Sequence, residues 1–229
     1  MFILVKFPSR GRPEKLMSTL KLYLEKADSI SRMFFMITLD SDDPTATSEL
    51  VQQILALGRN IQVQLGFSGS KIAAINRDLQ SAPPFDILLL ASDDMIPVIQ
   101  GYDSVIRSAM QMHYPTTDGV LWFNDGFRGK ELNTLCILGR KYFQRFGYIY
   151  HPEYKSLWCD NEFTDVANKL RRQKYIPEVI IRHDHPGNGV GTFDESYNQN
   201  CTNNDVDEAR YNLRKKSGFG IPPLYFLKR

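Results

Sequence analysis

The sequence predicts an α/β protein with a single domain, in which helices flank a mostly parallel central sheet and the second half is mixed. Strand-like and helix-like segments alternate from residue 2 to residue 95, as in a parallel sheet with right-handed crossovers. An apolar run that starts at Phe85 has the length of a buried central strand and ends in two adjacent carboxylates, Asp93 and Asp94. The 229 residues, of which 42% are hydrophobic, are enough to bury the core of one large domain.

The first half is predicted to alternate between strands and helices, beginning and ending with a strand. The strand-like runs cover residues 2–7, 32–39, 61–65 and 85–91. Helical patterns cover residues 14–27, residues 48–57 and the segment after Ser70. In the first of these helices the apolar residues fall on one face, which comprises Leu16, Leu20, Tyr23, Leu24 and Ala27.

The second half is predicted to be less regular. Helices are expected at residues 101–112, 140–146, 160–172 and 206–216, and strands at residues 119–124, 133–138 and 175–181. Between residues 182 and 207 the chain is polar and rich in Gly and Asn, which is typical of a long loop kept as a lid.

Composition excludes several classes of protein. A formal net charge of +2 gives no argument for a nucleic-acid or membrane partner, and no apolar run reaches the length of a membrane span, so no transmembrane segment is expected. The cysteines Cys136, Cys159 and Cys201 are far apart and odd in number, which disfavours a disulfide framework and a structural zinc site. A cytoplasmic location is therefore expected.

Asp93 and Asp94 indicate chemistry at the carboxyl end of the central strand, where open α/β sheets bind their ligands. Adjacent carboxylates repel each other unless a cation lies beside them, and a divalent ion carrying a nucleotide diphosphate is a common solution. The alternative is that the pair only closes the strand before Pro97.

Taken in order, these segments resemble the family-two-like glycosyltransferases of the GT-A fold, from residue 2 to about residue 185. The resemblance implies a nucleotide-sugar-binding half (1–95), an acceptor-side half (96–185), and a lid loop with a C-terminal helix (186–229). Ser92-Asp93-Asp94 takes the place of the family's Asp-x-Asp motif, although Ser92 stands where the motif has its first acid. The resemblance implies that Asp94 binds Mn²⁺ or Mg²⁺ and that Asp93 contacts the donor.

The loop after the first strand resembles the family's opening loop, which implies that Ser9, Arg10 and Arg12 contact the donor nucleotide. Arginine forks also suit a diphosphate. The alternative is a turn into a helix, with solvated arginines. Asp40 follows the second strand, where this fold often holds the base or ribose, and simple turn chemistry is equally compatible with it.

The segment from Gly66 to Arg77 resembles the family's Gly turn with a basic residue and an Asn near the donor. It implies that Lys71 contacts the donor phosphate or sugar, and that Asn76 is a packing or hydroxyl contact. A helix amino terminus with a cation can also hold an anion. The alternative is a Ser-capped helix with an exposed Lys71.

Two acids near the start of the predicted helix at 160–172 resemble the acceptor-side motif that supplies the base of inverting enzymes. The two acids point in different directions on a helix, so only one of them can face the acceptor hydroxyl, and Asp160 is favoured over Glu162. The alternative is that Asp160 only caps the helix. His183 and His185 resemble the late histidine that completes the metal site, and alternate residues of an extended segment can face the same way.

The resulting hypothesis is a metal-dependent, inverting glycosyltransferase that moves a sugar from a nucleoside diphosphate, with uridine diphosphate favoured, to an acceptor hydroxyl. The acceptor is left open among a glycan, a lipid, a protein and a modified nucleic acid. One alternative is a nucleotidyltransferase, although the loop after the first strand has only one glycine. Another is a non-catalytic module that binds a nucleotide or a glycan.

Overall fold

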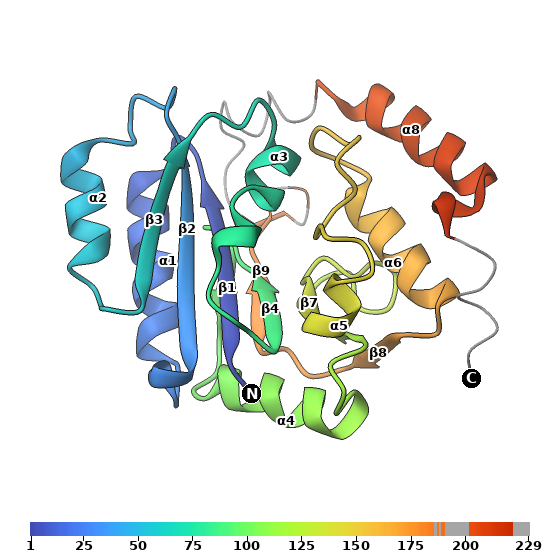
Figure 1. Ribbon diagram of the computed structural model, residues 1–229, viewed down its shortest axis with the longest axis horizontal. Coiled ribbons are helices and arrows are strands. Elements are labelled where there is room, and N and C mark those ends of the chain that lie inside the picture. The colour runs from blue at the N-terminus through green and yellow to red at the C-terminus, as the bar shows by residue number, and fades with distance from the viewer. Residues whose placement is uncertain (186, 188, 191–201, 222–229) are drawn as a thin grey trace.

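The computed structural model describes residues 1–185, 187, 189, 190 and 202–221 (Figure 1). The first half contains β1 (Ile3–Ser9), α1 (Pro13–Glu25), β2 (Met33–Asp40), α2 (Ser48–Leu55), β3 (Ile61–Gly66), α3 (Lys71–Asn76) and β4 (Ile87–Leu90). The second half contains β5 (Met95–Pro97), α4 (Tyr102–His113), β6 (Val120–Phe123), β7 (Ile137–Gly139), α5 (Arg140–Phe143), α6 (Cys159–Lys169), β8 (Gln173–Ile176), β9 (Ile181–His183) and α8 (Asn204–Lys216). Most of the predicted lid loop and the tail from residue 222 lie outside the described residues.

A central sheet has the strand order β3-β2-β1-β4-β7-β6-β8. The four strands of the first half are parallel. β1 lies between β2 and β4, so that its Val5 is opposite Phe35 of β2 and Leu89 of β4. β7 runs antiparallel to β4 and to β6, whereas β8 is parallel to β6. The prediction of a mostly parallel sheet with a mixed second half is thus confirmed.

The sheet buries a separate core on each face, because successive side chains of a strand point to opposite sides. Ile3 and Val5 of β1 pack with side chains of α1, α2 and α4. Leu4 packs on the other face with side chains of α3, α5, α6 and α8. In Figure 1, α6 and α8 lie side by side at the right of the sheet. The second core therefore joins the two halves of the chain.

The last strand was predicted wrongly. Residues 175–181 do not form one strand: β8 ends at Ile176 and β9 begins at Ile181. Pro177 follows β8 directly, and proline has no N–H to donate to a strand partner. β9 does not belong to the central sheet. It pairs with β5, a short strand just after the apolar run that the sequence analysis did not predict, and His183 of β9 lies opposite Met95 of β5.

Candidate active site

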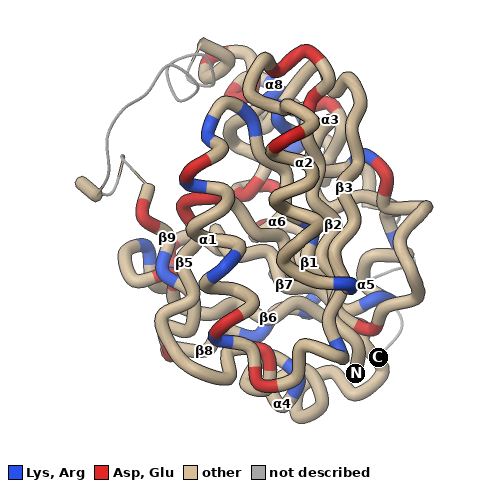
Figure 2. Tube along the Cα trace, turned by 90° about the vertical axis from the view of Figure 1, so that its left-hand side faces the viewer, with Lys and Arg blue, Asp and Glu red and all other residues tan. Residues whose placement is uncertain are grey.

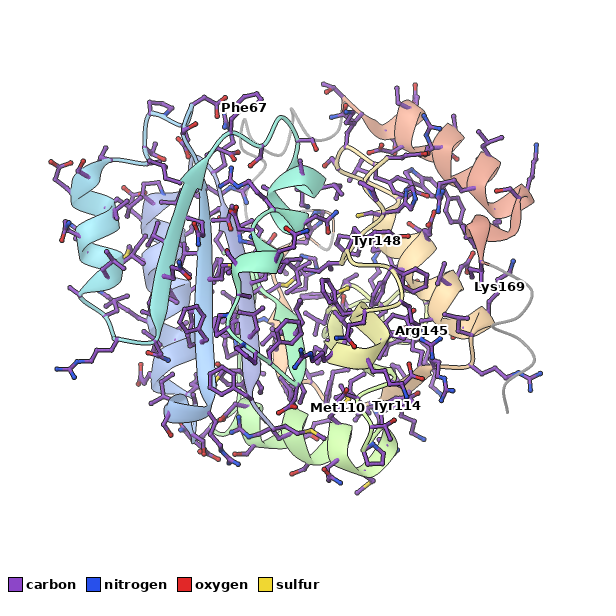
Figure 3. All side chains as sticks on the ribbon, viewed as in Figure 1. Phe67, Met110, Tyr114, Arg145, Tyr148 and Lys169 are labelled. Atoms are coloured by element: carbon purple, nitrogen blue, oxygen red, sulfur yellow. The ribbon has the colours of Figure 1, made fainter. Side chains whose placement is uncertain are left out.

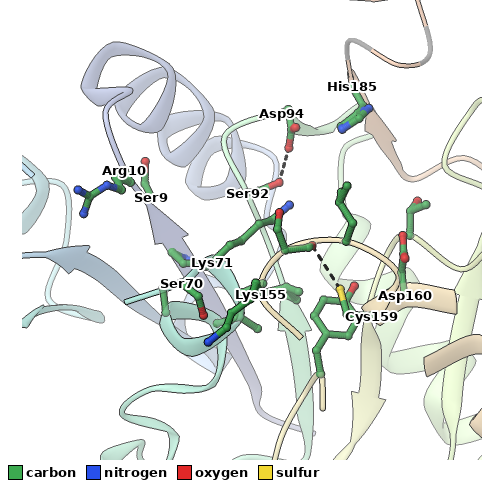
Figure 4. A pocket seen from close by; sticks show the side chains of 18 of the residues that line it. Ser9, Arg10, Ser70, Lys71, Ser92, Asp94, Lys155, Cys159, Asp160 and His185 are labelled. Carbon is green, nitrogen blue, oxygen red and sulfur yellow. Dashed lines mark hydrogen bonds between the residues drawn. The ribbon is translucent and has the colours of Figure 1, made fainter. Parts of the chain in front are cut away.

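A cleft of about 690 Å³ opens at the carboxyl ends of β1, β2 and β4. Its walls come from the loops after these strands, the start of α3, and the segment that leads into α6. Figure 4 shows Ser9 and Arg10 at one end of the cleft and Cys159 and Asp160 at the other. The lining residues include most of the predicted site, namely Ser9, Arg10, Arg12, Asp40, Lys71, Asp93, Asp94, Asp160, His183 and His185.

At the first end of the cleft, Arg10 bridges two acids of the loop after β2. Its guanidinium donates to both oxygens of Asp42, at 2.6 and 3.1 Å, and to Asp40 at 3.2 Å. The carboxylates hold the guanidinium in one orientation on the rim of the cleft. Arg10 therefore keeps a fixed place at the carboxyl ends of β1 and β2, where it can meet an anionic ligand.

Two residues at this end were missed by the sequence analysis. Phe67, just after β3, lines the cleft although its side chain is 69% exposed (Figure 3). Arg77 donates to the backbone oxygens of Gly66, Leu39 and Gln64 and to the Ser68 hydroxyl, thereby joining the ends of β2 and β3. An exposed aromatic residue in the Gly-rich turn was the available signal for Phe67. Arg77 had no local signal, because its acceptors lie far away in sequence.

Asp93 and Asp94 turn to different partners. Asp93 accepts a hydrogen bond from Arg12 at 3.0 Å and lies 3.4 Å from the Ser9 hydroxyl. Burial raises the pKa of Asp93, an effect that Arg12 opposes and Asp94 reinforces. Asp93 is therefore the acid that fixes the opening loop of the cleft.

Asp94 faces the histidines of β9 and the residues after it. Its Oδ2 lies 3.6 Å from His183 Nε2, and its Oδ1 accepts from the Ser92 hydroxyl. Burial by itself raises the pKa of Asp94, but the hydrogen bond and charge of His183, with the Ser92 bond, lower it below its usual range. Asp94 is thus held as a carboxylate.

His183 and His185 lie together, with ring centroids 5.3 Å apart. Burial lowers the pKa of His185 to about 4, and His183 adds to this effect. A neutral imidazole is the form that binds a metal. Even so, no group of three His, Cys, Asp or Glu side chains within the described residues has the spacing of a metal site.

Lys71 and Asn76, at opposite ends of α3, have separate environments. Ser70 caps the helix, since its hydroxyl accepts the Ala73 N–H at 3.1 Å, and Lys71 lines the cleft. Asn76 lies outside the cleft lining, donates to the Tyr150 carbonyl at 2.6 Å and accepts from the Ile149 N–H at 2.9 Å. Of the two roles that the resemblance left to Asn76, the structure supports packing and not a ligand contact.

Asp160 and Glu162 are separated as their positions on a helix predict. Asp160 lines the cleft, and burial raises the pKa of its carboxyl, which Lys71 partly opposes. Glu162 does not line the cleft and is only 4% exposed. Its oxygens accept from Arg214 at 2.7 and 2.8 Å and from the Tyr154 hydroxyl at 2.8 Å. The structure thus does not bring Glu162 to the site.

Further cleft residues come from two loops that carried no recognisable pattern and from the end of the predicted lid loop. Lys155, Arg128, Asn203 and Asn204 all line the cleft. The Lys155 carbonyl accepts the Ile72 N–H at 3.3 Å, which places this loop against the start of α3. The positions of Lys155 and Arg128 depend on contacts between distant segments, so the sequence offered no signal for these two residues beyond their polarity.

Several basic residues in the second half of the chain are paired with acids. Arg172 lies 3.5 Å from Asp118, Arg214 pairs with Glu162, and Lys215 lies 3.1 Å from Asp165. Figure 2 shows segments of both charges mixed along the trace.

No family model matches the chain, and no curated protein matches it. Among solved structures, it is similar to the mannosyltransferase PcManGT from Pyrobaculum calidifontis in complex with GDP-Man and Mn²⁺, with a TM-score of 0.64 and 13% identity over 79% of this chain and 56% of that one. It is also similar to S. aureus TarS 1–349 in complex with UDP-GlcNAc, with a TM-score of 0.61 and 18% identity over 80% and 58% of the two chains.

A third similar structure is that of S. aureus TarS, with a TM-score of 0.62 and 17% identity over 80% of this chain and 36% of that one. The chain thus spans 56% of the length of the PcManGT chain and 36% of the length of the TarS chain. These likenesses show that the chain has the GT-A fold of nucleotide-diphospho-sugar transferases, as the resemblance predicted. Within the described residues, no helix combines the length and apolar character needed to cross a membrane.

Proposed function

We propose that the protein is a metal-dependent, inverting glycosyltransferase that uses a nucleoside diphosphate sugar, with a uridine diphosphate sugar favoured, and an acceptor hydroxyl. The observation that carries the proposal is one cleft lined by the cations Arg10, Arg12 and Lys71 and, at the end away from Arg10, by the half-buried carboxylate of Asp160. The similar structures include complexes with GDP-Man and Mn²⁺ and with UDP-GlcNAc, which supports a nucleotide-sugar donor.

The side chains beside β5 have the donor types that a divalent metal accepts, although within the described residues their spacing is not that of a complete metal site. Asp94 is held as a carboxylate 3.6 Å from His183, and His185 lies next to it. Manganese accepts imidazole together with oxygen ligands, and the diphosphate oxygens of a donor would supply the ligands that the protein does not. When bound, the metal would neutralise charge on the leaving diphosphate.

The nucleotide end of the cleft would hold the rest of the donor. Phe67 offers an exposed ring on which a base can stack, and Arg10 offers a fixed guanidinium. Lys71 lies between the two ends and influences the carboxyl groups of both Asp94 and Asp160. A cation there would stabilise the departing diphosphate as the bond to the sugar breaks.

Asp160 is proposed as the general base. In an inverting transfer the acceptor oxygen forms a bond to the anomeric carbon while the bond to the diphosphate breaks, and the acceptor proton passes to the base. The raised pKa of Asp160 makes its carboxylate a better proton acceptor than an exposed aspartate. Glu162 cannot take this part, since Arg214 and Tyr154 occupy its oxygens.

The test compares Asp160→Asn with Glu162→Gln. Purified protein would be incubated with Mn²⁺ and UDP-GlcNAc or GDP-Man, and free nucleotide diphosphate would be measured with water or a panel of glycan acceptors. Asp160→Asn should lower turnover by at least about a hundredfold, which is the usual contribution of a general base. Glu162→Gln should keep turnover per folded molecule, and equal losses in both variants would contradict the assignment.

Calorimetry distinguishes the rival functions. Titration of UDP with and without Mn²⁺ into the wild-type protein and Asp94→Ala should show metal-dependent binding that the variant loses. Binding without turnover would favour the non-catalytic module. Release of pyrophosphate from a nucleoside triphosphate and a sugar phosphate would favour the nucleotidyltransferase. The acceptor class and a cytoplasmic location stay predictions.

A further inference from the structure

Asp207, on the first turns of α8, is a fully buried carboxylate that does not itself line the cleft. Its two oxygens accept three consecutive backbone N–H groups from a loop some fifty residues earlier. Lys155 donates to Oδ1 at 2.9 Å, and Ser156 and Leu157 donate to Oδ2 at 2.8 Å each. A carboxylate that satisfies three adjacent amides fixes the course of the backbone between them.

The loop that Asp207 holds is one wall of the cleft. Lys155, Ser156, Leu157 and Trp158 all line it, and α6 begins at the following residue. Trp158 has a φ of 61°, a left-handed conformation that a bulky side chain rarely adopts. Such a conformation persists only when the surroundings enforce it.

The same helix also holds the Trp158 side chain. The indole Nε1 donates to Asn204 Oδ1 at 3.2 Å, and its ring lies 5.2 Å from that of Tyr211. α8 thus fixes the backbone of the wall through Asp207 and the last wall residue through Asn204 and Tyr211. Asp160 stands only two residues beyond Trp158, so its place in the cleft depends on this entry into α6.

We propose that Asp207 is a positioning residue, which holds the wall from Lys155 to Trp158 and thereby orients Asp160 toward the reacting groups. The part that concerns Asp160 rests on the proposed function, whereas the anchoring of the wall does not. Misplacement of a catalytic group by about 1 Å can cost about a hundredfold in rate. Nucleotide binding at the far end of the cleft should not depend on this anchor.

The first measurement needs no ligand. In a Trp122→Phe background Trp158 is the only tryptophan, so acrylamide quenching of its fluorescence reports the wall, and hydrogen exchange reports the amides of residues 155–157. Asp207→Ala should speed exchange of these amides at least about tenfold and increase quenching. Asp207→Asn keeps one accepting oxygen, so its exchange and quenching should lie between those of the wild-type protein and Asp207→Ala. It provides a second variant if Asp207→Ala folds poorly.

Asp205→Asn is the matched control, since it removes an exposed charge from the same helix turn while the new amide keeps an oxygen that can accept the Asn204 side-chain N–H, as Asp205 does. Unchanged exchange and quenching in both Asp207 variants would overturn the proposal.

The second measurement is turnover of UDP-GlcNAc and GDP-Man with Mn²⁺, together with the dissociation constant of UDP. Asp207→Ala should lower kcat about a hundredfold and leave UDP binding within about twofold. A displaced wall with unchanged kcat would overturn the positioning role, as would a parallel loss of UDP binding and kcat. If the wild-type protein turns over neither donor, the proposed function fails, and the ligand-free arm still decides whether Asp207 anchors the wall.

Discussion

Lys6 lies fully buried in β1, behind the cleft, and its ammonium group allows a quantitative test of the electrostatics there. Nζ donates to the Thr38 hydroxyl and, at 2.6 Å, to the Arg77 carbonyl. Burial lowers the pKa of Lys6 from 10.5 to about 8, against the opposing charge of Asp78. The folded protein therefore binds this proton less tightly than the unfolded chain does.

The sign of the effect on stability follows from this lowered pKa. Below about pH 8 the charged Lys6 destabilises the fold, and the cost disappears as pH rises from about 8 to 10.5, because the folded state loses its proton first. A pKa unit corresponds to about 1.4 kcal/mol, so the full change is about 3 kcal/mol.

The perturbation is Lys6→Met, and the assay is urea unfolding from about pH 7 to about pH 10.5. Relative to the variant, the wild-type protein should gain about 3 kcal/mol of unfolding free energy across this range. Lys21→Met on the exposed side of α1 is the control and should show no comparable change. A wild-type minus Lys6→Met difference that stays constant with pH would refute the reasoning.

Three further outcomes are expected. Phe67→Ala should weaken UDP binding roughly 5- to 100-fold, measured by calorimetry, since stacking on a base contributes about 1–3 kcal/mol, and should leave the melting temperature unchanged because the ring is 69% exposed. Arg214→Met should lower the unfolding free energy by about 3–5 kcal/mol in urea, because it leaves Glu162 buried without its charge partner. Asp94→Asn should make any residual UDP binding insensitive to Mn²⁺ in the same calorimeter, and retained metal dependence would contradict the ligand assignment.

The parallel half of the fold could be predicted because its signals are local. Each buried strand is a short apolar run, and each helix shows an apolar face, as in α1 with Leu16 and Leu20. The bounds of the last two strands, β8 and β9, could not be predicted from local patterns. β9 is defined by its pairing with β5, which is distant in sequence, and the break after Ile176 coincides with Pro177.

The residues of the candidate site show the same difference between local sequence signals and contacts with distant residues. Residues in the loops that follow the parallel strands, such as Arg10 and Asp94, could be placed in the cleft because the ends of these strands meet at one edge. Helix geometry predicted that only one of Asp160 and Glu162 can face the cleft, and the bond of Glu162 to Arg214, 52 residues further on, identifies Glu162 as the one that does not. Likewise, nothing near Asp207 in sequence indicates that it holds residues 155–157.

Asp160 itself offers a prediction in which stability and activity move in opposite directions. Burial raises its pKa above the ordinary 3.8, so above this raised pKa the carboxylate destabilises the fold, and the cost disappears as pH falls toward 3.8. The position of Asp160 in the first turn of α6 has the opposite effect on stability, because an anion there stabilises a helix by about 0.3–1 kcal/mol.

If desolvation dominates, Asp160→Asn should be more stable than the wild-type protein at neutral pH in thermal and urea unfolding, and the gain should vanish near pH 4. A loss of stability at neutral pH would instead mean that the carboxylate serves the helix, as a purely structural role requires. A stabilised variant without turnover would identify Asp160 as a residue kept for chemistry at the expense of the fold.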